Sequence, residues 1–194
     1  MRLCNDRGVS MVYPFFTVGH SNRSSAAFLD ILRAAEIGVV ADVRRLPGSR
    51  ANPQFDQDRL SRSLAQFQIG YDYVPLLGGR RGKEKSVPPD LNGAWRNRSF
   101  HNYADYALTA EFAKGLAALI GLGRARKCAM MCSEAVWWRC HRRIIADHLL
   151  ARNEDVFHLM QEGRVQRAVL TPGAVIRDDL SVVYPAGPGE PAPG

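Results

Sequence analysis

The stretch CAMMCSEAVWWRCHRR, residues 128–143, carries the pattern that decides the fold. It begins with a short, almost wholly apolar run that ends at Cys132, and a helix-like pattern follows at about residues 136–151. Such a run leading into a helix is typical of one strand–helix unit of an α/β protein. Cys140 and His141 lie at the start of the expected helix, where unpaired backbone N–H groups bind anions and favour thiolates.

The same alternation of strand and helix patterns recurs on both sides of this stretch. We expect strands at residues 15–18, 39–43, 71–76, 127–132 and 156–160, and a short edge strand at 166–170. We expect helices at residues 24–35, 56–67, 103–120 and 136–151, with Gly121 and Gly123 ending the third. Pro75 places the third strand near an edge of the sheet. Repeated strand–helix units predict a single-domain, three-layer α/β fold: a mostly parallel sheet of about five strands flanked by helices.

The length of 194 residues suits one domain with a substantial core. We assign residues 13–184 to this domain and residues 1–12 to a loosely ordered N-terminal extension. Residues 185–194 are almost entirely proline, glycine and alanine, which predicts a disordered tail. Met11 precedes the first strand, so a start of translation there instead of at Met1 is a hypothesis that intact-mass measurement would test.

Composition narrows the class of protein. No apolar run is long enough to span a bilayer, the first residues lack a signal-peptide core, and three of the four cysteines lie at positions 128–140. We therefore expect a reduced, cytoplasmic protein without membrane contact. The net charge of +7, from 26 Lys+Arg and 19 Asp+Glu, favours an anionic small molecule or a nucleic acid as partner. The same charge also fits a mildly basic protein without such a partner, and the oligomeric state stays open.

Ligands of open parallel sheets bind beyond the carboxyl ends of the strands. The polar residues at those ends should therefore share one cleft with the start of the last expected helix. The catalytic candidates are Cys132, Glu134, Cys140 and His141, and the substrate-binding candidates are His20, Ser21, Asp42, Arg44 and Arg142.

Each candidate residue type suggests a role. Either Cys132 or Cys140 could be a nucleophile, and Glu134 and His141 could exchange protons. Arginines at positions 139, 142 and 143 crowd the positive end of the expected helix dipole, which an anionic ligand would offset. The alternatives are a packed thiol at position 132 and a solvated basic helix face. The spacing from Cys132 to the next arginine is one residue too long for a cysteine-phosphatase loop.

The cysteines also suggest a metal site, but their spacing is poor. Cys128 and Cys132 are four residues apart on one strand, hence roughly 13 Å apart, and cannot share a zinc ion. A set of Cys132, Cys140, His141 and the distant His20 could do so, although nothing in the sequence requires it. We therefore expect neither a metal nor a cofactor.

Several motifs together resemble the domain-of-unknown-function family number 488. They are TVGHSNRS at 17–24, DVRRLPGSRANPQF at 42–55, YDYVPLLGGR at 71–80, NYADYALTAEF at 102–112 and MCSEAVWWRCHRR at 131–143. The resemblance covers residues 15–170 and implies a compact α/β domain with a site at these motifs, but it names no reaction. The segment AVWWR before Cys140 departs from the acidic or proline-rich loop that members often have there.

Three functions fit these observations. The first is an enzyme, such as a hydrolase, that acts on an anionic nucleotide-like or nucleic-acid substrate at a Cys/Glu/His/Arg site. The second is a non-catalytic nucleotide or nucleic-acid binding module, and the third is a thiol-based redox or metal sensor. The rate of thiol labelling against pH discriminates among them, because only the first and third need a reactive thiolate.

Overall fold

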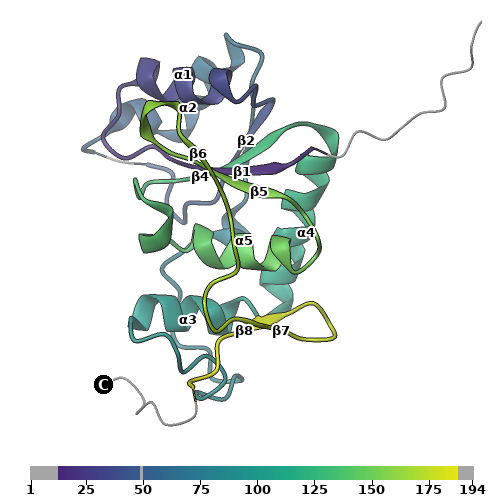
Figure 1. Cartoon of the computed structure of the whole chain (residues 1–194). Coiled ribbons are helices and arrows are strands. Elements are labelled where there is room, and N and C mark those ends of the chain that lie inside the picture. Colours follow the sequence, from purple (N-terminus) through teal and green to yellow (C-terminus); the bar gives the residue numbers. More distant parts are fainter. Residues whose placement is uncertain (1–12, 49, 188–194) are drawn as a thin grey trace, which may run out of the picture.

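The computed structural model describes residues 13–48 and 50–187, and a central sheet organises them (Figure 1). The sheet has six strands in the order β3-β2-β4-β1-β5-β6. Its strands are β1 Phe15–Gly19, β2 Val39–Asp42, β3 Gly70–Tyr73, β4 Cys128–Cys132, β5 Val156–Leu159 and β6 Val165–Arg167. The first five are parallel to their neighbours and β6 is antiparallel. This confirms the mostly parallel α/β fold, and β3 lies at the edge as Pro75 predicts.

Helices cover both faces of the sheet (Figure 1). They are α1 Ser25–Ala34, α2 Gln57–Ala65, α3 Arg98–Tyr106, α4 Ala110–Ala125 and α5 Arg142–Leu150. Single 3₁₀ turns are η1 Pro53–Phe55, η2 Pro75–Leu77, η3 Trp137–Arg139 and η4 Gln161–Gly163. Helices α1 and α2 lie on one face, and α4 and α5 lie on the other. A small antiparallel pair, β7 Val175–Ile176 and β8 Val182–Val183, lies beside α3.

The residues of β4 divide the core into two clusters. Cys128, Met130 and Cys132 pack with residues of α3, α4 and α5, whereas Ala129 and Met131 pack with residues of α1 and α2. Every residue of β4 is buried. Burial on both faces explains why the strand is a continuous apolar run instead of an alternating one.

The expected helix at 103–120 is in fact two helices, α3 and α4. Thr109 ends the continuity, because its side chain accepts a hydrogen bond from the backbone N–H of Phe112 and caps α4. The expectation that Gly121 and Gly123 end this helix is also wrong, since α4 runs to Ala125. A Cβ at Gly123 would lie 2.2 Å from the ring of Phe15, so this glycine permits close packing of α4 on β1.

The expected helix at 136–151 begins only at Arg142. Before it, Trp137 stacks on His158 of β5 at 4.2 Å between ring centroids, and its indole N–H donates to Gln166. These two contacts of the indole hold η3, the segment just before Cys140, as a 3₁₀ turn. The backbone of Cys140, which follows it, is extended. Arg139 consequently lies outside α5. The expectation that three arginines lie at the positive end of this helix dipole is therefore wrong for Arg139.

Smaller differences concern the edges of the fold. The third strand ends at Tyr73 because Pro75 begins η2, and the expected edge strand at 166–170 is β6. Residues 1–12 and 188–194, including both candidate start methionines, lie outside the described residues. Among the described residues, no helix has the length and apolar character needed to cross a membrane.

Candidate functional site

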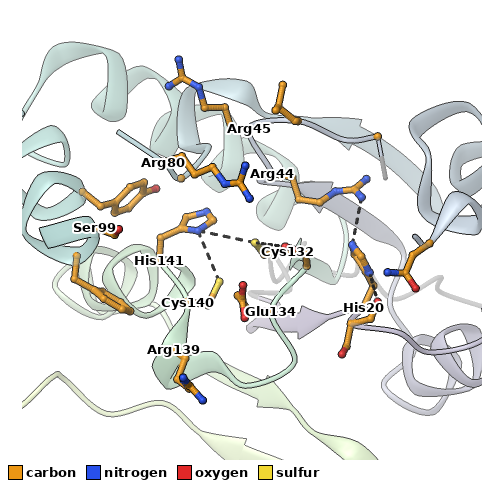
Figure 2. Close-up of a pocket in the computed structure, with 18 of the residues that line it drawn as sticks. His20, Arg44, Arg45, Arg80, Ser99, Cys132, Glu134, Arg139, Cys140 and His141 are labelled. Carbon is orange, nitrogen blue, oxygen red and sulfur yellow. Dashed lines mark hydrogen bonds between the residues drawn. The ribbon is translucent and has the colours of Figure 1, made fainter. Parts of the chain in front are cut away.

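A cleft of about 590 Å³ lies at the carboxyl ends of β1, β2 and β4 (Figure 2). Seven of the nine residues singled out from the sequence line it: His20, Ser21, Arg44, Cys132, Glu134, Cys140 and His141. Asp42 and Arg142 do not line the cleft but lie buried behind it. The start of α3 closes one side through Ser99, Phe100 and Tyr103.

The centre of the cleft is a cluster of Cys132, Cys140 and His141. Nδ1 of His141 lies 3.7 Å from Sγ of Cys140 and 3.9 Å from Sγ of Cys132. The other ring nitrogen, Nε2, lies 3.0 Å from the carbonyl oxygen of Val43. A carbonyl only accepts, so Nε2 carries the proton and donates it. The lone pair of Nδ1 therefore faces the two sulfur atoms.

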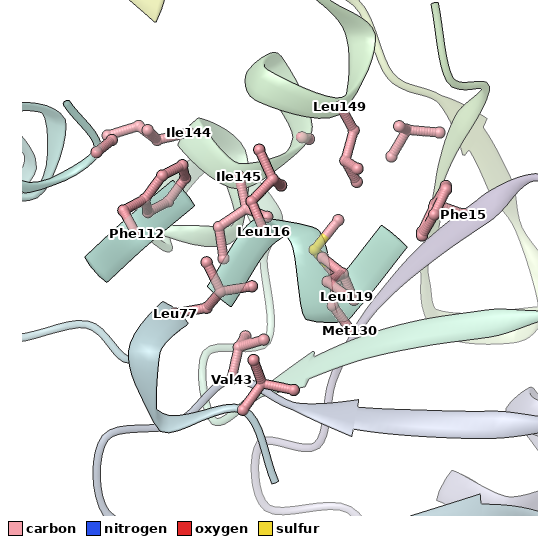
Figure 3. Packing of buried hydrophobic residues seen from close by; sticks show 14 of the residues in the cluster. Phe15, Val43, Leu77, Phe112, Leu116, Leu119, Met130, Ile144, Ile145 and Leu149 are labelled. Atoms are coloured by element: carbon pink, nitrogen blue, oxygen red, sulfur yellow. The ribbon is translucent and has the colours of Figure 1, made fainter. Parts of the chain in front are cut away.

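The fold positions each member of this cluster. Cys132 is the last residue of β4, and Val43 directly follows β2, the neighbouring strand. His141 is the residue before α5, and Ile144 and Ile145 of α5 pack in the same apolar cluster as Met130 of β4 (Figure 3). The sheet and α5 thus fix the imidazole and both thiols from opposite sides.

The two thiols differ in acidity. Burial alone would raise the pKa of Cys140, but hydrogen bonds from Cys132 and Arg142 and the positive charge of Arg142 lower it to about 6. The pKa of Cys132 is raised to about 12, first because its thiol donates to Cys140 and then because it is buried. Cys140 is therefore the thiolate of the pair. The sequence named both Cys132 and Cys140 as candidate nucleophiles, and this difference in acidity favours Cys140.

Arg142 has a different environment from the exposed one that the sequence suggested. Its side chain is only 1% exposed. Nε donates to Sγ of Cys140 at 3.2 Å, and Nη2 donates to the carbonyl oxygen of Glu134 at 2.6 Å. The guanidinium thus joins α5 to the loop after β4 and holds the sulfur of Cys140. Arg142 itself does not line the cleft.

Asp42 and Arg44 form a buried ion pair. Nε of Arg44 lies 2.9 and 3.0 Å from the two carboxylate oxygens, and Nη2 donates both to Asp42 and to the carbonyl oxygen of Phe55. Tyr71 donates its hydroxyl to the same carboxylate at 2.6 Å. These contacts engage both carboxylate oxygens of Asp42 with protein donors. Arg44 also lines the cleft, and its Nη1 lies 3.3 Å from Nε2 of His20.

His20 is neutral at physiological pH. Burial lowers its pKa to about 4, although Nδ1 donates to the carbonyl oxygen of Ser21. Nε2 accepts from Nη1 of Arg44 at 3.3 Å, and the ring stacks on Phe55. With both nitrogens engaged in this way, His20 supports the cleft wall and orients Arg44.

The exposed positive charges of the cleft come from arginines outside the nine site candidates. Arg45, Arg80 and Arg139 line the cleft with exposed side chains, and Glu134 adds an exposed carboxylate. Figure 2 shows Arg80 between Arg45 and His141. Arg80 has a φ of 55°, a left-handed conformation that is uncommon for a residue with a side chain. Observed strain of this kind concentrates at functional sites.

The glycine before Arg80 has a steric reason. A Cβ at Gly79 would lie 2.8 Å from Nδ1 of His141, so only glycine lets this loop pass so close to the imidazole. The run GGR was therefore a usable sequence signal for the site. The place of Ser99, Phe100 and Tyr103 in the cleft depends on how α3 packs against η2, through the hydrogen bond from the Tyr103 hydroxyl to the carbonyl oxygen of Leu77.

The same cluster also offers metal ligands. The Sγ atoms of Cys132 and Cys140 and one nitrogen of His141 all lie within 4.8 Å of one another. His20, which the sequence offered as a fourth ligand, has both nitrogens in other contacts.

Comparison with known proteins agrees with the motifs. The family model for "Domain of unknown function DUF488" matches residues 24–149, which include α1, β4 and nearly all of α5. The chain belongs to this family. No curated protein and no solved structure matches it. Membership therefore attaches no reaction to the cleft.

Proposed function

We propose that this DUF488 protein is an enzyme that acts on an anionic, nucleotide-like or nucleic-acid substrate in the cleft. One observation carries the proposal. The exposed guanidiniums of Arg45, Arg80 and Arg139 surround a cleft whose centre holds a thiol aligned with an imidazole. Guanidinium groups bind phosphate oxygens in bidentate fashion, and a paired thiol and imidazole provide a nucleophile and a base.

The chemistry follows from which atoms face each other. Cys140 attacks as the thiolate that Arg142 stabilises, because Nε of Arg142 donates to its sulfur, and Nδ1 of His141 lies 3.7 Å from the same sulfur. The sulfur then forms a bond to the electrophilic atom of the substrate, and the leaving group departs from that atom with its electron pair. The exposed carboxylate of Glu134 lies in the same cleft and takes a proton from the water that cleaves the covalent intermediate.

This assignment narrows one role expected from the sequence and revises another. Of the two candidate nucleophiles, Cys140 is chosen over Cys132, because Cys140 has the shorter contact with Nδ1 and also receives the Arg142 hydrogen bond. Arg44 and Arg142 become positioning residues, because their donors are directed to protein groups. Anion binding passes to the exposed arginines.

The test combines binding with turnover. Nucleotides, short oligonucleotides and sugar phosphates should be screened for those that raise the melting temperature, and those ligands should then be assayed for conversion. The Cys140→Ser variant should bind but not turn over, while Cys128→Ser, a buried thiol outside the cleft, should retain turnover. A ligand shift that survives joint replacement of Arg45, Arg80 and Arg139 by alanine would refute the proposed anion site. Binding without conversion of any ligand would favour a non-catalytic binding module.

A further inference from the structure

We propose that Cys132, Cys140 and His141 bind one thiophilic divalent metal ion of the Zn²⁺ type, with the fourth coordination position open to the cleft. Three features support this site: the positions of the donor atoms, the partners that orient them, and the number of ligands that meet there.

The donor atoms already stand near the spacing that zinc requires. With Zn–S of about 2.3 Å and Zn–N of about 2.0 Å, tetrahedral geometry places a sulfur and a nitrogen ligand about 3.5 Å apart. The two distances from Nδ1 of His141 to the sulfur atoms are 3.7 and 3.9 Å. All three ligand atoms lie within 4.8 Å of one another, so only small side-chain adjustments would close the site.

The imidazole is oriented as a metal ligand would be. A histidine that binds a metal through one nitrogen usually donates its other N–H to a carbonyl or carboxylate. Here Nε2 donates to the carbonyl oxygen of Val43 at 3.0 Å, which leaves the Nδ1 lone pair directed at the sulfur atoms. Gly79 keeps space beside Nδ1, because a Cβ there would lie 2.8 Å from it.

The sulfur atoms have suitable neighbours as well. Nε of Arg142 donates to Sγ of Cys140 at 3.2 Å, and the hydroxyl of Ser133 lies 3.9 Å from Sγ of Cys132. Two thiolates would neutralise the charge of a divalent ion. The bound ion would therefore not strongly repel the nearby guanidinium of Arg142. Donors to ligand sulfur are typical of the outer shell around a metal.

Three ligands, and not four, meet at this point. Within the described part of the chain, no other Cys, His, Asp or Glu joins the cluster. The cluster borders the cleft, so the remaining position faces the space where a ligand would enter. Three protein ligands with an open position are typical of reactive or exchangeable zinc sites, whereas structural sites have four.

Metal binding would regulate the proposed enzyme. A bound ion occupies the lone pairs of Cys140 and His141 that nucleophilic attack requires, so the metal-loaded form should be inactive by the thiol route. This consequence rests on the proposed function. The binding of the metal does not, because it depends only on the three donors.

The test uses the reduced, full-length protein freed of metal by a chelator and then titrated with Co²⁺. We expect one equivalent to bind, with the intense visible bands of tetrahedral Co²⁺ and a near-ultraviolet thiolate-to-cobalt band, and Zn²⁺ should displace it. Cys132→Ala and His141→Ala should lose or strongly weaken these bands. Cys128→Ala, which removes a buried thiol on the same strand but outside the cluster, should retain them.

Each outcome bears on the proposal in a definite way. Absence of the bands in the wild-type protein would overturn it, as would bands that survive loss of Cys132. If Cys132→Ala does not fold, as judged by circular dichroism, the His141→Ala variant and the wild-type spectrum decide. Turnover of the metal-free protein tests the proposed enzyme separately, so failure of one proposal is distinguishable from failure of the other.

Discussion

Replacing Arg142 with alanine should destabilise the protein by about 3 kcal/mol. The same replacement of an exposed arginine on a helix surface would hardly change the stability. The side chain is 1% exposed and donates to the carbonyl oxygen of Glu134 at 2.6 Å and to Cys140 at 3.2 Å. Loss of a charged donor to a buried acceptor costs about 1.5–3 kcal/mol. The vacated space, roughly 80 Å³ if unfilled, adds about 2 kcal/mol. Removal of a buried charge offsets part of this sum.

The assay is thermal and urea denaturation of the variant beside a matched control. For a chain of this size, about 3 kcal/mol corresponds to a fall in melting temperature of about 6–12 °C. Arg139→Ala removes the same side chain three positions earlier, where it is exposed, and should change stability by less than about 0.5 kcal/mol. Arg142→Lys should recover only part of the loss, because an ammonium cannot reproduce the two directed contacts. Equal melting temperatures for the two alanine variants would refute the structural role of Arg142.

Three further predictions concern acid stability, the glycine loop and the exposed carboxylate. Burial lowers the pKa of His148 to about 3, so below pH 6.5 the unfolded state binds more protons than the folded state. This group should lower the free energy of unfolding by up to about 1.4 kcal/mol for each pH unit below 6.5. His148→Leu should therefore make the free energy of unfolding, measured by urea denaturation from pH 6 to 4, depend less steeply on pH. Gly79→Ala should displace His141 and reduce turnover and Co²⁺ binding, whereas Gly82→Ala, with no atom near its Cβ, should change neither. Glu134→Gln should leave the melting temperature within a few degrees but lower turnover; unchanged turnover would exclude the proton-transfer role.

The place of the site was predictable because it depends on strand ends. The apolar run at 128–131 is buried on both faces, so it had to be an inner strand, and inner parallel strands deliver their last residues to one edge of the sheet. Cys132 and His20 meet at the cleft for that reason. Their chemical roles stay predictions, since topology places a side chain but does not decide what it binds.

The start of α5 was not predictable from the local pattern. The residues before it could be helical, but Trp137 stacks on His158 of β5, a contact that the local sequence does not reveal. The same limit applies to the break at Thr109, where a capping hydroxyl competes with an apolar stripe that continues across it. In both places a single side-chain contact outweighs helix propensity, which differs among ordinary residues by less than about 1 kcal/mol.

The arginines show that tertiary contacts, which the local sequence pattern does not reveal, also affect how function is inferred. Arg44 and Arg142 belong to the most recognisable motifs, and their donors are directed to a carboxylate, backbone carbonyls and a sulfur atom of the protein. The exposed positive charge around the cleft belongs to Arg45, Arg80 and Arg139, which those contacts do not involve. A buried guanidinium is fixed by its partners, whereas an exposed one can turn toward an anion. Replacing the buried pair, Arg44 and Arg142, should therefore alter the fold and the thiol cluster. Replacing the exposed arginines should instead alter the affinity for anions and its dependence on salt.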